Sequence, residues 1–137
     1  MSFPVNTSMH LVKGEDLNHH GTLYAGRSAE WFVESGFISA AMPTRPENIV
    51  CVKIHGMTFS RPIQKGEVVT FKSQIVKVGR TKIIVLIEAH VADQIAVRGF
   101  MTFVHVDLQG NPQPHGLELA PVTEEEKALY DEASKLV

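Results

Sequence analysis

Cysteine is nearly absent from this chain of 137 residues, and its single example is Cys51. One cysteine cannot form an internal disulfide, so a disulfide-stapled secreted scaffold is excluded. Long apolar stretches are missing as well, since no run approaches the ~20 residues of a membrane-spanning helix. The first residues, Met1–Asn6, lack the charged start and apolar run of a signal peptide. We therefore expect a cytoplasmic protein without membrane contact.

A charge excess of either sign is also missing. The formal net charge is -2, so there is neither a basic surface for nucleic acid nor an acidic tail. Hydrophobic residues make up 44% and charged residues 20%, a balance that supports a packed core and argues against disorder. The length corresponds to one domain, and we expect it to cover residues 1–137.

Turn signals and apolar runs alternate along the chain and predict its secondary structure. One long helix is expected over Thr22–Met42, because the segment contains no proline and is followed by Pro43 and Pro46. Thr123 with Glu126 forms a capping box that predicts a short C-terminal helix. Five strands are predicted, over Ser8–Lys13, Ile49–Phe59, Val68–Val78, Thr81–Val91 and Ile95–Val106.

This order of elements favours an α+β fold: a strand, the long helix, then four long antiparallel strands in a meander. The helix is apolar on most sides and is therefore expected to be buried against the concave face of a curved sheet. A flank of small side chains would let the sheet approach closely, and it comprises Ala25, Ala29, Val33, Gly36 and Ala40. Such a sheet keeps an open edge strand that a second copy would cover, so we expect at least a homodimer, with a tetramer or hexamer left open.

Three motifs follow one another in register from about residue 8 to residue 107: Asp16–Glu34 (DLNHHGTLYAGRSAEWFVE), Met57–Glu67 (MTFSRPIQKGE) and Val78–Thr81 (VGRT). Together they resemble the hotdog-fold acyl-CoA thioesterases of the 4-hydroxybenzoyl-CoA thioesterase-like superfamily. The resemblance implies one long central helix wrapped by a curved, mainly antiparallel five-stranded sheet. It also implies hydrolysis of an acyl-CoA to a free acid and CoA, with no cofactor because CoA is part of the substrate.

The resemblance further implies a catalytic carboxylate on the helix. In many relatives it lies seven positions after the second glycine of a pair, which is Val33 here, and the carboxylate follows one residue later at Glu34. We expect Glu34 to act as general base or nucleophile, because partial desolvation on an apolar helix would raise its pKa. The alternative is a surface glutamate in an ion-pair stripe with Arg27 and Glu30.

The helix start and the loop before it supply the other expected groups. Backbone N–H groups near Gly26 would stabilise the thioester oxygen as an oxyanion hole, although Ala25 replaces the first glycine of the family's pair. The resemblance suggests that Asn18 orients the attacking water or the carbonyl, with His20 beside it; a turn or cap role for Asn18 is the alternative. The histidines show no metal-ligand spacing, so no metal is expected.

Gly79, Arg80, Thr81 and Lys82 form a predicted hairpin, which in the family meets the phosphate end of CoA. Cations and backbone N–H groups suit phosphate, whereas ordinary solvated residues are the alternative. Two other functions remain open. A hotdog hydratase or dehydratase would need a histidine–acid pattern that we do not find, and a non-catalytic acyl-CoA-binding module would be compatible with Val33 at the usual acidic position.

Overall fold

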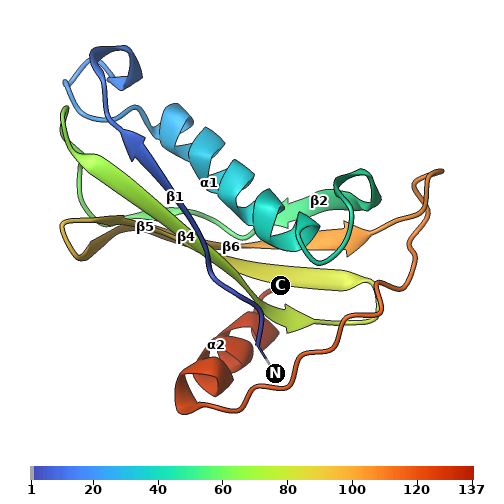
Figure 1. Ribbon diagram of the computed structural model, residues 1–137. Helices are drawn as coiled ribbons and strands as arrows, with labels where there is room; N and C mark the ends of the chain where they lie inside the picture. The colour runs from blue at the N-terminus through green and yellow to red at the C-terminus, as the bar shows by residue number, and fades with distance from the viewer. Residues whose placement is uncertain (1) are drawn as a thin grey trace.

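The computed structural model describes residues 2–137 as one antiparallel sheet with an α-helix on each face (Figure 1). Along the sheet the strand order is β1-β4-β5-β6-β2, and the short β3 pairs with β6. The strands are β1 Asn6–Leu11, β2 Ile49–Ile54, β3 Thr58–Phe59, β4 Val68–Val78, β5 Lys82–Val91 and β6 Gln94–His105. The helices are α1 Ala25–Ala41 and α2 Glu124–Ser134, and short 3-10 turns cover Gly14–Asp16 and Pro46–Asn48.

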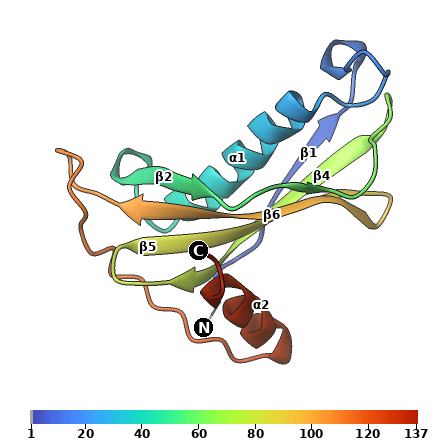
Figure 2. The same ribbon diagram turned by 180° about the vertical axis from the view of Figure 1, so that it is seen from behind.

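The predicted α+β architecture is confirmed. The long helix α1 lies along one face of the curved sheet, and α2 lies on the opposite face (Figure 2). The residues of β4 are those predicted, and α1 begins three residues later than expected, after the irregular segment that enters it. No helix in the described part of the chain is long and apolar enough to cross a membrane.

The predicted four-strand meander is wrong, because β4, β5 and β6 alone run as consecutive neighbours after α1. The strand that follows α1 pairs instead with β6, where Val50 lies opposite Val104. The reason is that β1 already occupies the free edge of β4. Asn6 lies opposite Ser73, and the pairing continues to Leu11, which lies opposite Val68. The strand after α1 can therefore extend the sheet only on the β6 side.

The predicted strand Ile49–Phe59 is broken into β2 and β3, which gives the sheet six strands rather than five. The break is at Gly56, which has a φ of +105, a left-handed conformation that favours glycine. At the same place Gly99 of β6 passes so close that an added Cβ would clash with the Gly56 carbonyl oxygen. Two glycines thus permit a close backbone approach at the end of β2.

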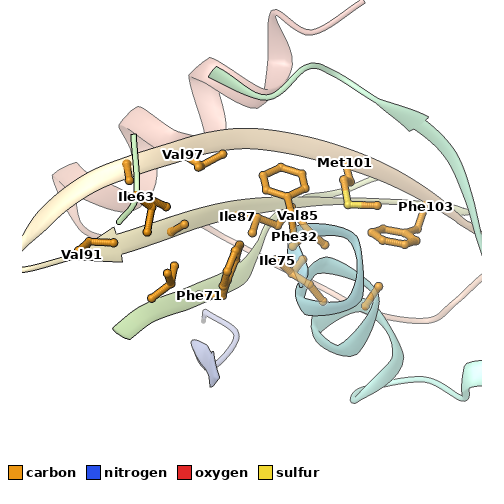
Figure 3. Close-up of a cluster of buried hydrophobic side chains, with 14 of the residues drawn as sticks. Phe32, Ile63, Phe71, Ile75, Val85, Ile87, Val91, Val97, Met101 and Phe103 are labelled. Carbon is orange, nitrogen blue, oxygen red and sulfur yellow. The ribbon is translucent and has the colours of Figure 1, made fainter. Parts of the chain in front are cut away.

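The core lies between α1 and the sheet (Figure 3). Phe32 of α1 is fully buried and packs among strand residues such as Phe71 and Met101. The predicted small-residue flank faces the sheet only in part: Gly36 and Ala40 are buried, whereas Ala25 is exposed and Ala29 and Val33 are half-buried. The full set of buried helix residues is Ser28, Phe32, Ser35, Gly36, Ser39, Ala40 and Ala41.

Serines can face the sheet because they bond to one another. The Ser73 hydroxyl on β4 donates to the Ser35 carbonyl at 2.7 Å, and the Ser35 hydroxyl donates to Ser73 Oγ at 3.0 Å. The hydroxyls of Ser39 and Ser73 lie 2.7 Å apart, and Asn6 Nδ2 of β1 donates to Ser73 Oγ at 3.3 Å. This buried cluster, called the serine cluster below, ties α1 to β4 and β1.

The predicted capping box of the C-terminal helix is confirmed. Thr123 Oγ1 accepts the Glu126 N–H at 3.0 Å, and Glu126 Oε1 accepts the N–H groups of Thr123 and Val122, both at 2.9 Å. The backbone N–H groups of Thr123 and Val122 lower the pKa of Glu126 to about 2. The start of α2 is therefore held by a carboxylate that stays ionised in moderate acid.

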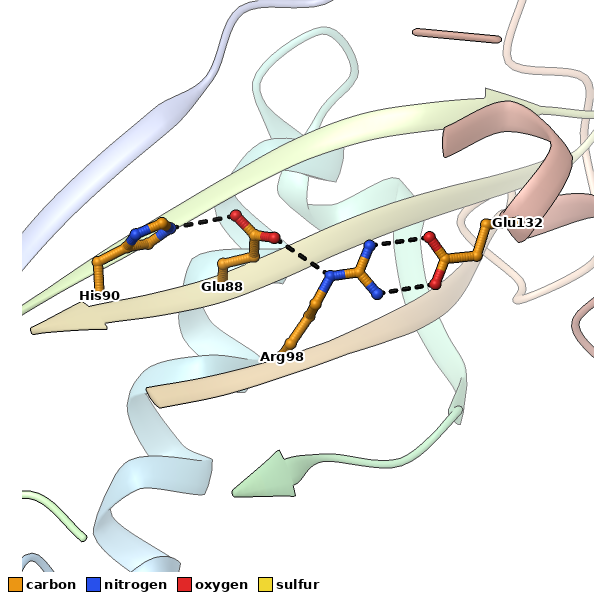
Figure 4. Close-up of polar contacts among 4 residues, drawn as sticks. All are labelled: Glu88, His90, Arg98 and Glu132. Carbon is orange, nitrogen blue, oxygen red and sulfur yellow. Dashed lines mark hydrogen bonds and ion pairs between the residues drawn. The ribbon is translucent and has the colours of Figure 1, made fainter. Parts of the chain in front are cut away.

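An ion-pair chain fastens α2 to the sheet (Figure 4). Arg98 of β6 donates to both carboxylate oxygens of Glu132 on α2, at 2.7 and 2.8 Å. Its Nε donates to Glu88 of β5 at 3.2 Å, and Glu88 also lies 3.1 Å from His90 Nε2. Beside this chain Val76, Leu86, Phe100 and Ala133 form a second small core. Both charge and apolar packing therefore hold α2 on this face.

Candidate active site

The entry to α1 is built around a buried carboxylate. Asp16 is 4% exposed; its Oδ2 accepts the Lys13 N–H at 2.9 Å and its Oδ1 lies 3.3 Å from Arg27 Nε. Its carbonyl accepts the Tyr24 N–H at 2.8 Å. These contacts fix the position from which α1 begins. Asp16 is thus occupied in holding the backbone.

Asn18 organises the loop that precedes the helix. Its Oδ1 accepts the N–H groups of His20 at 2.9 Å and Thr22 at 3.2 Å, and its Nδ2 donates to Thr22 Oγ1 at 3.0 Å. These are the contacts of a turn residue, the alternative role that the sequence left open. His20 is exposed and its ring lies beside that of His19.

The first turn of α1 has free backbone donors. Tyr24 is the N-cap and makes no side-chain cap bond, and its carbonyl accepts the N–H groups of Arg27 and Ser28. Among the described residues, the N–H groups of Ala25 and Gly26 have no acceptor. Free N–H groups at a helix start attract negative charge. The space directly above Gly26, however, is taken by the Tyr24 ring, with which a Cβ at Gly26 would clash.

A cavity of about 290 Å³ opens between the start of α1 and the segment Phe59–Ile63. The Leu23 N–H donates to the Ile63 carbonyl at 2.8 Å, which holds this segment beside the helix. Its lining is mainly apolar and comprises Asn18, Leu23, Ala25, Ser28, Phe59, Ser60, Arg61, Pro62 and Ile63. A concave, largely apolar lining with a few polar groups is typical of a small-molecule site.

The cation in this lining is already paired. Arg61 donates to both carboxylate oxygens of Glu67 at 3.0 Å. The pKa of Glu67 is held below its usual value, first by the N–H of Gln64 and further by the Arg61 guanidinium. The pair therefore remains ionised, and the positive charge of Arg61 is largely cancelled.

Glu34 lies on a different face of α1. With Gly26, Glu30, Val33 and two other residues it lines an open depression of about 590 Å³, which shares none of its lining residues with the first cavity. Val33 and Glu34 point about 100° apart around the helix. Glu34 is exposed in the single chain. The chain thus brings Gly26 and Glu34 to one surface and places Asn18 in a separate cavity.

An aromatic contact beside Glu34 was not anticipated from the sequence. The ring of His10 on β1 stacks on Trp31 of α1, with centroids 4.2 Å apart and planes 9° apart, and meets the edge of Phe71. Burial lowers the pKa of His10, while the carboxylates of Glu34 and Asp16 act in the opposite direction. No hydrophobic signal in the sequence indicated this contact, because the alternate residues of β1 that are half-buried are polar.

The predicted CoA-binding hairpin, Gly79–Lys82, lies at the end of the sheet where α1 finishes, away from the helix start (Figure 1). Thr81 accepts the His105 N–H at 2.8 Å, and His105 lies opposite Ile49, the first residue of β2. Within one chain this hairpin is therefore distant from the cavity at the start of α1. No group of three or more His, Cys, Asp or Glu side chains in residues 2–137 is placed to hold a metal ion.

Comparison with curated proteins finds relatives of one kind. An uncharacterized acyl-CoA thioester hydrolase of Bacillus subtilis, YkhA, is 31% identical over 124 residues, which cover 86% of this chain and 71% of the relative. The acyl-CoA thioester hydrolase YciA of Salmonella typhimurium is 31% identical over 116 residues, which cover 76% of this chain and 84% of the relative.

Solved structures agree with these relatives. A hexameric acyl-CoA thioesterase superposes with a TM-score of 0.84 and 26% identity, covering 95% of this chain and 86% of that one. An acyl-CoA hydrolase from Bacillus cereus gives 0.81 and 26% identity, covering 95% and 82%. The family model of the thioesterase superfamily matches residues 20–97, from the loop before α1 to the start of β6. That match covers more than half of the chain and includes the start of α1, so the chain belongs to the thioesterase superfamily.

Proposed function

We propose that this protein hydrolyses the thioester of an acyl-CoA to a free acid and CoA. The observation that carries the proposal is the mainly apolar cavity at the start of α1, lined by Ala25, whose backbone N–H has no acceptor; the next N–H, of Gly26, is also free and borders the neighbouring depression. Family membership and the names of the curated relatives support the same chemistry.

The reaction adds water to the thioester carbonyl, and the C–S bond then breaks to release the CoA thiolate. A thiol has a pKa of roughly 8.5, so the thiolate leaves with little help from an acid. The main demand is stabilisation of the negative charge on the former carbonyl oxygen. The N–H groups of Ala25 and Gly26 and the positive end of α1 are the proposed donors, once the Tyr24 ring moves aside from Gly26.

We assign the catalytic carboxylate to Glu34, as general base or nucleophile, with Asn18 and His20 beside the thioester. In one chain Glu34 and Asn18 face different depressions. The proposal therefore includes a homodimer in which each site takes its cavity from one copy and its carboxylate from the other. Hexameric relatives support assembly of this kind.

The edge strand β2 is the proposed contact between two copies. Its side chains Val50, Val52 and Ile54 are exposed to water. An isolated chain would also leave the edge of this strand open to unwanted pairing. In a two-fold, antiparallel pairing the start of one β2 lies beside the end of the other. The partner's hairpin, with its copies of Gly79, Arg80, Thr81 and Lys82, would then approach the cavity of the first copy and meet the CoA phosphates.

The proposal is tested by measuring the release of free thiol with a thiol-reactive dye. The substrates compared are short, medium, long and aromatic acyl-CoAs. Glu34→Gln should lower kcat by about a hundredfold or more, the usual range for a lost general base. Glu30→Gln is the matched control, because Glu30 lies one turn away on the same exposed face. Equal losses in both variants, or none in Glu34→Gln, would remove Glu34 from the mechanism.

A non-catalytic acyl-CoA-binding module is the second candidate. It is favoured by Val33, which stands where many relatives have the acid. Under this alternative the protein would bind acyl-CoA in titration calorimetry and release no thiol from any ester. Release of thiol by the wild-type protein would exclude it.

A further inference from the structure

One residue of the cavity lining has a buried polar atom without a partner. Ser28 is 1% exposed, and its Oγ makes no hydrogen bond. Within residues 2–137 it is the one buried side-chain oxygen or nitrogen in this condition. Buried hydroxyls almost always have a partner, so an exception at the wall of a cavity calls for a physical explanation.

The usual partner of a helical serine is blocked here. A serine inside a helix normally donates to the carbonyl four residues earlier, as Ser134 does to the Tyr130 carbonyl at 2.8 Å. For Ser28 that carbonyl belongs to Tyr24, and it already accepts the N–H groups of both Arg27 and Ser28. The Ser28 hydroxyl therefore keeps a free donor, and because Ser28 lines the cavity, a bound group that displaces the atoms covering Oγ can accept from it.

The rest of the lining indicates which group this would be. Arg61 is neutralised by Glu67, and Asn18 is engaged in its turn. The hydroxyls of Ser28 and Ser60 belong to the same lining, among apolar neighbours such as Leu23. This lining offers no unpaired cation for a carboxylate, but it can pair an uncharged oxygen. A volume of about 290 Å³ suits a short chain.

We propose that Ser28 is a specificity-determining residue, which hydrogen-bonds an uncharged hydroxyl or oxo group carried by a short acyl chain. This inference rests on the proposed function, because it names the substrate class of that same cavity. A substrate oxygen then completes the hydrogen bonding of a hydroxyl that the folded chain leaves unpaired. Acyl groups without this oxygen bind with Ser28 still unsatisfied, and a site of this kind discriminates against them.

The test compares kcat/KM for 3-hydroxybutyryl-CoA, butyryl-CoA and succinyl-CoA. The wild type should prefer the hydroxy ester over butyryl-CoA by about tenfold or more, and should not favour succinyl-CoA. Ser28→Ala should bring the hydroxy-to-butyryl ratio close to one. Ser134→Ala, a helical serine far from the cavity, should keep the wild-type ratio. A ratio unchanged by Ser28→Ala overturns the inference, whereas turnover of butyryl-CoA alone already supports the proposed function.

Two further measurements separate the possible failures. If no ester releases thiol, the proposed function fails, and the ratio of dissociation constants for hydroxybutyryl-CoA and butyryl-CoA tests Ser28 instead. Thermal unfolding tests whether the hydroxyl already has a partner in solution. Ser28→Ala should melt at the same temperature as the wild type or higher, because it removes an unsatisfied polar atom. A clearly lower melting temperature would show a structural partner and would overturn the inference.

Discussion

Ser73→Ala should destabilise the protein, although it removes a single oxygen atom. Ser73 Oγ contacts the hydroxyls of Ser35 and Ser39, the Ser35 carbonyl and the side chain of Asn6. Alanine at this position leaves the two helix hydroxyls buried without their partner. Each can turn toward the carbonyl four residues earlier, so the loss is at the low end for an orphaned group, about 1 kcal/mol.

The expected total is therefore about 2 kcal/mol. For a chain of 137 residues the unfolding entropy is about 0.29 kcal/mol per kelvin, from roughly 2.1 cal/mol per kelvin per residue. The melting temperature of Ser73→Ala should then fall by about 7 °C. Circular dichroism melts at fixed protein concentration measure this shift, with concentration held constant because assembly adds to apparent stability.

Ser28→Ala is the matched control, since it makes the same chemical change at another buried serine. The hydrogen bonding of the two serines predicts different results: a clear loss of stability in Ser73→Ala, and none in Ser28→Ala. Equal shifts in both would show that the difference in hydrogen bonding does not decide stability here, and the reasoning behind both serines would be refuted.

Two further predictions concern acid and CoA binding. Because the pKa of Glu126 is lowered from 4.5 to about 2, its cap stabilises α2 fully above about pH 4.5 and progressively less as the pH falls toward 2. The protection factors of the α2 amides, which are exchange rates corrected for the intrinsic rate at each pH, should therefore fall between pH 5 and pH 3 in the wild type and be low at both in Glu126→Gln. Arg80→Ala should raise KM for acyl-CoA by roughly three- to tenfold with kcat nearly unchanged; a fall in kcat at constant KM would speak against phosphate binding by this hairpin.

Local patterns predicted the elements well and their long-range pairing poorly. Alternation of apolar and polar residues located β4 at its observed bounds, and the capping box located the start of α2. Nothing local tells β2 which edge of the sheet to join. That choice follows from β1, which occupies the other edge of the sheet. There β1 pairs with residues of β4 that are more than fifty positions away from it in the sequence. The glycine contact that ends β2 depends on Gly99 in the same way.

In the candidate site, too, the features that depend on nearby residues were predictable and those that depend on long-range packing were not. Asn18 lies in the loop before α1 and Gly26 in its first turn, close to the expected helix start, because both belong to one short segment. The orientation of α1 about its own axis depends on the serine cluster and on Phe32, and no residue spacing reveals it. The sequence therefore could not show that Glu34 faces away from the cavity. Ser28 was missed because a serine in a helix has no distinguishing pattern until its neighbours are known.

The position of α2 limits the symmetry that this chain can adopt. A self-complementary contact along β2 joins two copies and then leaves no surface of the same kind for a third copy. A closed ring or a double ring needs a second, different contact on each copy. Because α2 stands on the outer face of the sheet and is fastened there by Arg98 and Glu132, two sheets cannot stack directly over that area. Growth beyond two copies must therefore avoid the area that α2 covers and use another surface of each chain.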